Sequence, residues 1–281
     1  MSATWRSDTP PPPARIGVAG WARAILRGAG VGALNAGGLV LMLVLRLVER
    51  PLFGAHRPLT PYITQGVCKG SLAIIGLGVS IRGQPMEGGG AVVANHSSWL
   101  DIFVLNAPQR IYFVSKAEVA NWPFIGLLAR ATGTVFIRRE RREARAQAIM
   151  LRERLAAGHR LLFFPEGTST DGLRVLPFKT TLFAPFLDDG LRADLAVQPV
   201  TARYHAPEGE DPRFYGWWGD MSMGPHLLKV LAAPRQGRVE LTFHPPLHAR
   251  DFGDRKALAR AAESAVRAPF EDQFEDRAAG D

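Results

Sequence analysis

The sequence contains one cysteine, Cys68, among 281 residues, so it can form neither an internal disulfide bond nor a cysteine-based metal site. It also lacks the G-x-S-x-G pattern of serine hydrolases, because residues 167–171 end in aspartate where that pattern requires glycine. Negative charge is scarce relative to positive charge: 26 Asp and Glu face 34 Lys and Arg, for a net charge of +8. Such an excess is typical of chains that meet an anionic partner, and both a nucleic acid and a bilayer fit it.

Charge is absent from one long run near the N-terminus. Residues 29–45 carry none, and at seventeen residues they reach the lower limit for a helix that spans a membrane. A second apolar run covers residues 70–81. We expect residues 21–82 to form a membrane-associated helical segment, in which the two runs pair within one leaflet or the first run spans the bilayer alone. Residues 1–20, polar and rich in proline, are expected to be a disordered tail. A signal peptide is not favoured, because the apolar run starts late and no small-residue cleavage site follows it.

Residues 28–33 match the relaxed dinucleotide pattern G-x-G-x-x-A. A helical pattern over residues 21–27 precedes them, whereas the nucleotide motif requires a strand at that place. We therefore expect no nucleotide cofactor, and we interpret Gly28 and Gly32 as small residues that let membrane helices pack closely.

The middle of the chain alternates strand-like and helical patterns. After a glycine-rich linker at residues 84–90, five strand-like runs begin near residues 91, 133, 161, 195 and 239. The clearest helix covers residues 140–157, with apolar residues on one side and Gly158 as its C-terminal cap. These patterns predict an α/β fold: one mixed-sheet domain flanked by helices over residues 83–250, followed by a polar C-terminal helix or tail over residues 251–281.

A histidine and an aspartate lie five positions apart directly after the apolar run at residues 91–94. Five residues turn a helix by about 500°, so His96 and Asp101 cannot share a helix face. We place His96 in the turn beyond a buried strand and Asp101 in the first turn of the next helix. A histidine can act as a general base when a carboxylate fixes its tautomer. The alternative is structural: Ser98 and Asp101 match a capping box, S-x-x-D, with His96 a polar turn residue.

A second polar cluster follows about seventy residues later. Residues 160–164 have the pattern of a buried strand, and Pro165, Glu166, Gly167 and Thr168 begin the loop that leaves it. A carboxylate thus stands again just beyond a strand end, where open α/β sheets place their sites.

Together, N-H-x4-D and F-P-E-G-T resemble the motifs of the glycerolipid acyltransferase family. Residues 133–139 resemble its G-x-x-F-I-x-R block, with Arg139 as the arginine, and residues 197–200 resemble its short apolar-proline block, here a core strand with an edge-tolerated proline. Four blocks stand in the family's order over about 110 residues. Arg139 also fits a solvated helix face, since several arginines crowd the same stretch.

The resemblance implies a membrane-bound O-acyltransferase. His96 would take the proton of an acceptor hydroxyl, Asp101 would support the charged imidazole, and donors near Gly167 and Thr168 would stabilise the oxyanion. No cofactor or metal is implied; the donor would be a fatty acyl thioester of acyl carrier protein or coenzyme A. A bacterial member would work at the cytoplasmic side of the inner membrane in phospholipid biosynthesis.

The remaining site residues follow from the same resemblance. Arg139 would hold a phosphate of the lipid or of the carrier. Glu166 would position the acceptor or brace its loop, and Lys179 would serve the carrier phosphate or the oxyanion.

The chain departs from the family at Ser169, where the commonest form has an arginine after E-G-T that helps to hold the acceptor's phosphate. The expected acceptor is 1-acylglycerol-3-phosphate, with lyso-ornithine lipid or another lysophospholipid as the alternative. Residues 217–221 and His226 also resemble the lyso-ornithine branch. Two other classes stay open: a lipid transacylase that needs no thioester, and a membrane-anchored nucleic-acid binder, which would leave His96, Asp101 and Glu166 without a role.

Overall fold

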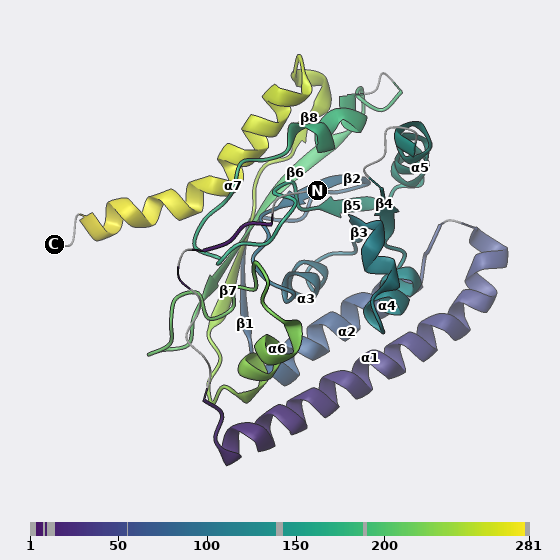
Figure 1. Cartoon of the computed structure of the whole chain (residues 1–281). Helices are drawn as coiled ribbons and strands as arrows, with labels where there is room; N and C mark the ends of the chain where they lie inside the picture. Colours follow the sequence, from purple (N-terminus) through teal and green to yellow (C-terminus); the bar gives the residue numbers. More distant parts are fainter. Residues whose placement is uncertain are drawn as a thin grey trace.

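The computed structural model describes residues 4–7, 9, 15–54, 56–138, 143–187 and 190–278. Within these residues the strands form one eight-stranded mixed sheet in the order β1-β7-β6-β2-β5-β3-β4, with β8 paired to β6 (Figure 1). The neighbours β1/β7, β6/β2, β2/β5, β5/β3 and β3/β4 are parallel, and β7 and β8 run antiparallel to β6. The strands are β1 (Gly78–Arg82), β2 (Gly90–Ala94), β3 (Tyr112–Lys116), β4 (Val135–Ile137), β5 (Arg160–Phe163), β6 (Ala196–His205), β7 (Arg238–Phe243) and β8 (Leu247–His248).

Helices cover both faces of this sheet. The α-helices are α1 (Val18–Phe53), α2 (Thr60–Ile75), α3 (Asp101–Asn106), α4 (Ile125–Thr132), α5 (Ala144–Ala156), α6 (Met223–Ala232) and α7 (Arg255–Ala278). Short 3₁₀ segments lie at Ala117–Asn121, Thr180–Leu187 and Ala249–Asp251. The α/β expectation is therefore confirmed.

The core has two layers, one on each face of the sheet. Strand β2 is buried along its whole length, and its side chains alternate between the layers: Val92 and Ala94 pack toward α2, α3 and α6, whereas Ala91 and Val93 pack toward α5 and α7. A strand buried on both faces has a continuous apolar sequence, which is why this strand could be predicted.

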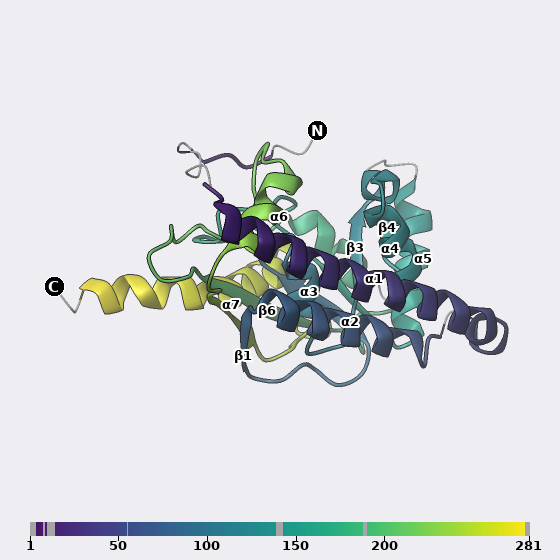
Figure 2. The ribbon, with the colours of Figure 1, turned by 90° about the horizontal axis from the view of Figure 1, so that it is seen from below.

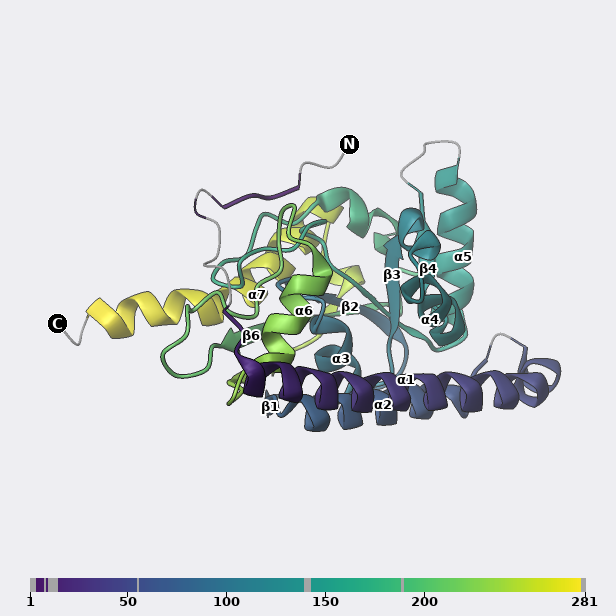
Figure 3. The same ribbon diagram turned by 60° about the horizontal axis from the view of Figure 1, so that its bottom comes forward.

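The two N-terminal helices pack antiparallel and lie side by side along one edge of the domain (Figures 2 and 3). Gly38 lies against Val67 and Gly70 against Leu34, so closely that a β-carbon at either glycine would force its neighbour to move. The glycine interpretation made from the sequence was wrong for Gly32, which has nothing within 4 Å of a β-carbon position. Gly28 does not pack on α2 either, because a β-carbon there would meet Leu231 of α6 at an ordinary contact distance of 3.5 Å.

A buried carboxylate joins the two helices. Glu49, near the end of α1, accepts hydrogen bonds from the backbone N–H groups of Leu59 and Thr60 at 2.8 and 3.1 Å and from the Thr60 hydroxyl at 2.7 Å. These N–H groups at the start of α2 have no partner within their own helix, so Glu49 caps α2. The pair is therefore a fixed helical hairpin.

The first turns of α1 are hydrogen-bonded to the C-terminal end of α6. Arg23 donates to the carbonyl of Ala232 at 2.9 Å, and Arg27 donates to those of Leu231 and Ala233 at 3.0 and 2.7 Å. These carbonyls end α6, where cations are favoured by the helix dipole. Among the described residues α1 is the one helix long and apolar enough to cross a membrane, judged by length and composition only.

Several sequence expectations need correction. The apolar run 70–81 is not one helix: α2 begins earlier, at Thr60, and ends at Ile75, after which Gly76 adopts a left-handed conformation and the chain enters β1. Helix α5 spans residues 144–156 within the predicted 140–157, and Gly158 closes it with positive φ as expected. The proline in residues 197–200 does not lie on an edge strand. Pro199 is in the interior strand β6, between the residues that pair with β8 and those that pair with β7. The predicted domain boundaries stay predictions.

Candidate active site

The turn after β2 places His96 at the carboxyl end of the parallel strands, as the sequence predicted. Asn95, fully buried, fixes the start of this turn: its side chain donates to the carbonyl of Ala202 at 2.9 Å and accepts from the N–H of Ala202 at 2.8 Å. The chain is thereby bound to β6 before it reaches His96. Helix α3 then begins at Asp101.

Asp101 is completely buried and accepts four hydrogen bonds. Its Oδ2 lies 2.7 Å from Nδ1 of His96, 2.9 Å from the N–H of Ser97 and 3.0 Å from the N–H of Ser98. Its Oδ1 accepts the hydroxyl of Tyr204 at 2.6 Å. The carboxylate therefore orients the imidazole. The capping box expected as the alternative is only half formed: Asp101 accepts the Ser98 N–H, but the Ser98 hydroxyl accepts from Leu100 and not from Asp101.

The imidazole of His96 is held on its face as well as at Nδ1. It stacks on Phe164 with ring centroids 4.1 Å apart and planes 13° apart. Its side chain is 22% exposed, and no hydrogen bond to Nε2 is found in the part of the chain that the structure describes. Because Nδ1 donates to Asp101, Nε2 is the nitrogen that can accept a proton from a bound hydroxyl.

Glu166 braces the loop after β5 against the His96 turn. One carboxylate oxygen accepts the N–H of His96 at 2.7 Å and the other accepts the N–H of Leu176 at 2.7 Å. The side chain is only 2% exposed. Burial raises the pKa of Glu166 to about 8, against the lowering effect of these two N–H donors. Of the two roles expected for Glu166, this geometry fits the loop brace.

The rest of the F-P-E-G-T loop lies against the same turn. Gly167 has φ +71°, a left-handed conformation that favours glycine, and its N–H donates to the carbonyl of Phe164 at 3.0 Å. That N–H is thus bonded within the loop, and the oxyanion role expected of donors near Gly167 and Thr168 remains a prediction. The N–H of Thr170 donates to the carbonyl of His96 at 2.9 Å.

The segment before α6 and His226 within α6 close the other side of the turn. The N–H of Trp217 donates to the carbonyl of Ser97 at 2.8 Å, and the indole N–H of Trp99 donates to Nδ1 of His226 at 2.9 Å. His226 is 3% exposed, and burial, assisted by the charge of Lys229, lowers its pKa to about 4. The imidazole is thus neutral and accepts the Trp99 bond across a wide pH range.

Residues near the N-terminus also contact the site. The N–H of Trp5 lies 3.4 Å from the hydroxyl of Thr168, and the Trp5 ring packs beside Trp218 and under Arg174, which pairs with Asp171. Although the sequence predicted a disordered tail over residues 1–20, the described residues there make specific contacts with the catalytic loops, and α1 already begins at Val18.

The other two binding residues expected from the sequence are Lys179 and Arg139. The backbone N–H of Lys179 donates to the carbonyl of Pro165 at 2.9 Å, which sets Lys179 at the far end of the Glu166 loop. Arg139 lies outside the described residues; its neighbour Arg138 pairs with Glu143 at 3.3 Å. No group of three or more His, Cys, Asp or Glu side chains among the described residues could hold a metal ion.

Sequence reasoning missed Tyr204 as part of the site, and it gave no role to Asn95 and Phe164 although both belong to the motifs quoted above. Tyr204 lies 103 positions after Asp101, and Asn95 meets Ala202 across 107 positions. No spacing rule connects such pairs. The position of Phe164 gave a weak signal for its place in the site. It directly precedes the Glu166 loop and therefore lies at the same strand end.

A buried Asp–His pair can act as a general base on a bound hydroxyl, and among the described residues no serine or cysteine side chain is hydrogen-bonded to Nε2 of His96. This is the arrangement expected of an acyl-transfer enzyme, and the comparisons agree. The family model described as Acyltransferase matches residues 79–203. Together with the relatives described next, one of them 62% identical over 94% of this chain, this match shows that the chain belongs to the glycerolipid acyltransferase family and is an acyltransferase.

Individual relatives show which lipid acyltransferases this chain is similar to. The chain is 62% identical to the lyso-ornithine lipid O-acyltransferase of Rhodobacter capsulatus, over 94% of this chain and 95% of that one. It is 33% identical to the 1-acyl-sn-glycerol-3-phosphate acyltransferase of Neisseria gonorrhoeae, over 73% of this chain and 79% of that one. The fold resembles the crystal structure of the 1-acyl-sn-glycerophosphate acyltransferase PlsC from Thermotoga maritima, with a TM-score of 0.56, 20% identity, and coverage of 88% and 98%.

Proposed function

We propose that this protein transfers a fatty acyl group from an acyl thioester to the free hydroxyl of a lyso-ornithine lipid. The observation that carries the acyl transfer is the His96–Asp101 hydrogen bond of 2.7 Å at a buried carboxylate. The acceptor is supported by the relatives: the protein named for lyso-ornithine lipid is 62% identical, and the one named for 1-acyl-sn-glycerol-3-phosphate is 33% identical. The acceptor first expected from the sequence, 1-acylglycerol-3-phosphate, thus becomes the second candidate.

The loop chemistry agrees with this choice. A lyso-ornithine lipid offers an amine and a carboxylate, not a phosphate. Ser169 replaces the arginine that commonly follows E-G-T in the family, and Arg174, five positions later, is held by Asp171 through contacts of 3.2 and 3.0 Å. A guanidinium already paired in this way is poorly suited to bind a phosphate.

The reaction needs one base and no covalent enzyme intermediate. Nε2 of His96 removes the proton of the acceptor hydroxyl, and the oxygen attacks the thioester carbonyl carbon. Collapse of the tetrahedral intermediate expels the carrier's thiolate, which takes the proton from the imidazolium. The buried carboxylate of Asp101 stabilises the imidazolium while it carries that proton.

The acceptor and the acyl chain are membrane lipids, and α1 is suited to reach them. Its apolar side chains are largely exposed, among them Val40, Leu43, Val44, Leu47 and Leu52. At 36 residues it is roughly 54 Å long, well beyond the roughly 30 Å hydrocarbon core, and its first third is bonded to α6. We propose that α1 and α2 lie together in one leaflet, at the cytoplasmic side of the inner membrane, instead of spanning it.

The test offers the full-length protein, in mixed micelles, a labelled acyl thioester of acyl carrier protein or of coenzyme A. Lyso-ornithine lipid and lysophosphatidate are supplied in separate reactions, and thioester-free reactions with a diacyl lipid donor test the transacylase alternative. We expect label to enter the ornithine lipid from a thioester donor. Label in phosphatidate alone would overturn the acceptor, and turnover without any thioester would overturn the donor.

Two variants make the test specific. His96→Ala should lower turnover by about 10²- to 10⁴-fold, the usual contribution of a general base. Ser169→Arg restores the common family residue at a half-buried loop position and should raise the rate with lysophosphatidate relative to lyso-ornithine lipid. A folded His96→Ala protein with nearly full activity would contradict the mechanism.

A further inference from the structure

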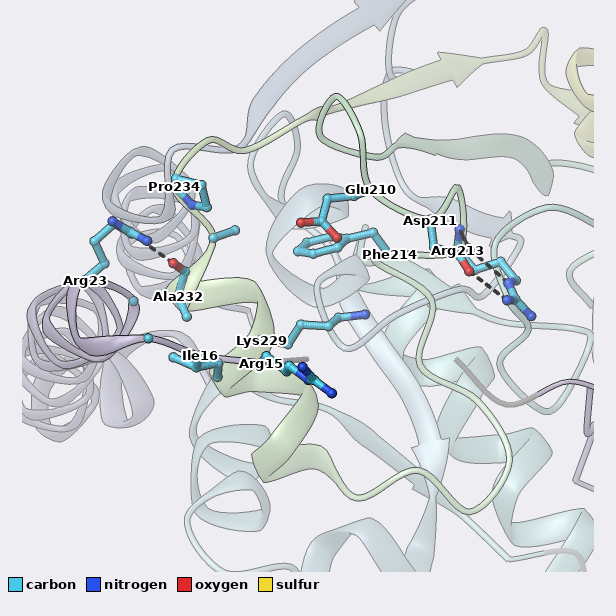
Figure 4. Close-up of a pocket in the computed structure, with 13 residues that line it drawn as sticks. Arg15, Ile16, Arg23, Glu210, Asp211, Arg213, Phe214, Lys229, Ala232 and Pro234 are labelled. Atoms are coloured by element: carbon cyan, nitrogen blue, oxygen red, sulfur yellow. Dashed lines mark hydrogen bonds and ion pairs between the residues drawn. The ribbon is translucent and has the colours of Figure 1, made fainter. Parts of the chain in front are cut away.

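Two open pockets lie outside the catalytic turn in the part of the chain that the structure describes, and the charges of their linings differ. One, between the start of α1, α6 and the loop before α6, holds Arg15, Arg23 and Lys229 but also Glu210 and Asp211 (Figure 4). Arg213 in this pocket is bound to Asp211 at 2.7 Å. Two carboxylates thus offset half of the four positive charges in this lining.

The second pocket, of about 440 Å³, lies at the opposite edge of the parallel strands from His96. It is formed where β2, β3 and β5 begin and where the chain passes from α1 to α2. Its lining consists of His56, Arg57, Pro58, Pro61, Tyr62, Gly88, Arg110, Tyr112, Ala157, Gly158, His159 and Arg160. The length of β2, roughly 16 Å at about 3.3 Å per residue, separates it from the catalytic turn.

This lining contains three arginines and no carboxylate. A fourth arginine, Arg154, lies directly behind it, with its guanidinium 4.5 Å from the centre of the Tyr112 ring. The arginines are held in place by neutral groups: Arg57 donates to the carbonyl of Ala131 at 2.9 Å, and Arg160 donates to that of Gly88 at 2.8 Å. Glu49 and Glu87 act on this cluster only from outside the lining.

The positive charges are packed closely enough to repel one another. Burial and the charge of Arg46 lower the pKa of Arg57, and burial together with Arg110 lowers that of Arg160. Bringing like charges together in a half-buried pocket costs free energy that a bound anion would recover.

A buried N–H group in the same lining also favours a bound anion. His159, 5% exposed, accepts a hydrogen bond at Nδ1 from Arg154 at 2.6 Å, and burial lowers its pKa to about 4. The neutral ring therefore carries its proton on Nε2. That buried atom has no hydrogen-bond partner among the described residues. The Nε2 atoms of His205 and His226 share this property, but only His159 of the three lines this pocket.

We propose that this pocket is an anion site, distinct from the catalytic site, that binds the phosphate of a phosphate ester through Arg57, Arg110 and Arg160. Planar guanidinium groups that converge on one space match the oxygens of a phosphate. The pocket adjoins the α1–α2 connection, so the headgroup of an anionic membrane phospholipid can reach it, and so can a soluble phosphate ester. The site does not depend on which lysolipid is the acceptor.

The experiment titrates full-length protein in nonionic micelles with dihexanoyl-phosphatidylglycerol and, separately, with glycerol 3-phosphate, while the midpoint of thermal unfolding is followed. A ligand that binds the folded state raises this midpoint in a saturable way. The double variant Arg110→Gln/Arg160→Gln should weaken the apparent affinity about 30-fold, from the loss of two charges. Arg250→Gln/Arg255→Gln, which removes two exposed arginines elsewhere, should change it less than twofold.

The two ligands distinguish the sources of phosphate. A response to phosphatidylglycerol alone assigns the site to a lipid headgroup, and a response to glycerol 3-phosphate at similar concentration assigns it to a soluble ester. Arg110→Glu serves as a second variant, because Arg110 is exposed and its reversal leaves the buried bonds intact. The proposal is overturned if neither ligand shifts the parent protein, or if Arg110→Glu and the double variant titrate like the parent.

Discussion

Tyr204 should act as a positioning residue for the catalytic pair, and replacing it by phenylalanine tests this. The change removes one hydroxyl that donates to Oδ1 of Asp101 at 2.6 Å, inside a region where Tyr204 is 7% exposed and Asp101 is fully buried. A hydrogen bond to a charged group is worth about 1.5 to 3 kcal/mol. If that stabilisation is needed while the imidazolium forms, kcat should fall about 10- to 100-fold.

The expected kinetic pattern separates positioning from binding. Tyr204 is buried behind Asp101, so the KM for the lysolipid should stay within twofold while kcat falls. The measurement is the initial rate of acyl transfer over a range of lysolipid concentrations, at a temperature where the variant is folded.

Tyr215 provides a matched control. It is also a buried tyrosine, and its hydroxyl bonds Gln236 at 2.9 Å and the N–H of Gly237 at 2.7 Å, without contact to Asp101. Tyr215→Phe should lower stability by a similar amount and leave kcat nearly unchanged. If Tyr204→Phe keeps the parent kcat while losing as much stability as Tyr215→Phe, then Tyr204 is structural and the reasoning fails.

Three further predictions concern the same turn. Asp101→Asn should lower kcat by about 10³- to 10⁴-fold, because an amide no longer fixes the imidazole tautomer; an active variant in the acyl-transfer assay would contradict this. Glu166 has a folded pKa of about 8 against an ordinary value of 4.5, so its contribution to stability is complete below pH 4.5 and is lost as the pH rises through 8. Thermal unfolding of Glu166→Gln should show a lower midpoint, from one N–H left unpaired, and a smaller decline between pH 5 and pH 9 than the parent. The pH dependence of stability that His226 contributes runs in the opposite direction. Because its folded pKa is about 4 against an ordinary 6.5, stability present above pH 6.5 is lost as the pH falls toward 4. Thermal unfolding curves of His226→Asn should therefore be less sensitive to acid than those of the parent.

The parts of the fold that the sequence predicted are those fixed by local patterns. The buried strand β2, the turn with His96 and the helix start at Asp101 follow one another between residues 90 and 101, and each has its own composition signal. Strand β1 was missed because its apolar residues continue those of α2 without a polar break. The only local signal was Gly76, whose φ of +85° ends the helix, and a glycine inside an apolar run fits a membrane helix equally well.

In the candidate site, the sequence predicted which residues take part but not which atoms they contact. The pattern F-P-E-G-T identifies Glu166 as a site residue but does not say what its carboxylate binds. In the fold, the loop after β5 crosses the turn after β2, and two backbone N–H groups, of His96 and Leu176, would be buried there without an acceptor. Each such orphan would cost about 1 to 3 kcal/mol, and a glutamate is long enough and has two oxygens to satisfy both. We infer that the loop geometry demands glutamate at position 166, so that this residue acts on the reaction through the His96 backbone and not through the substrate.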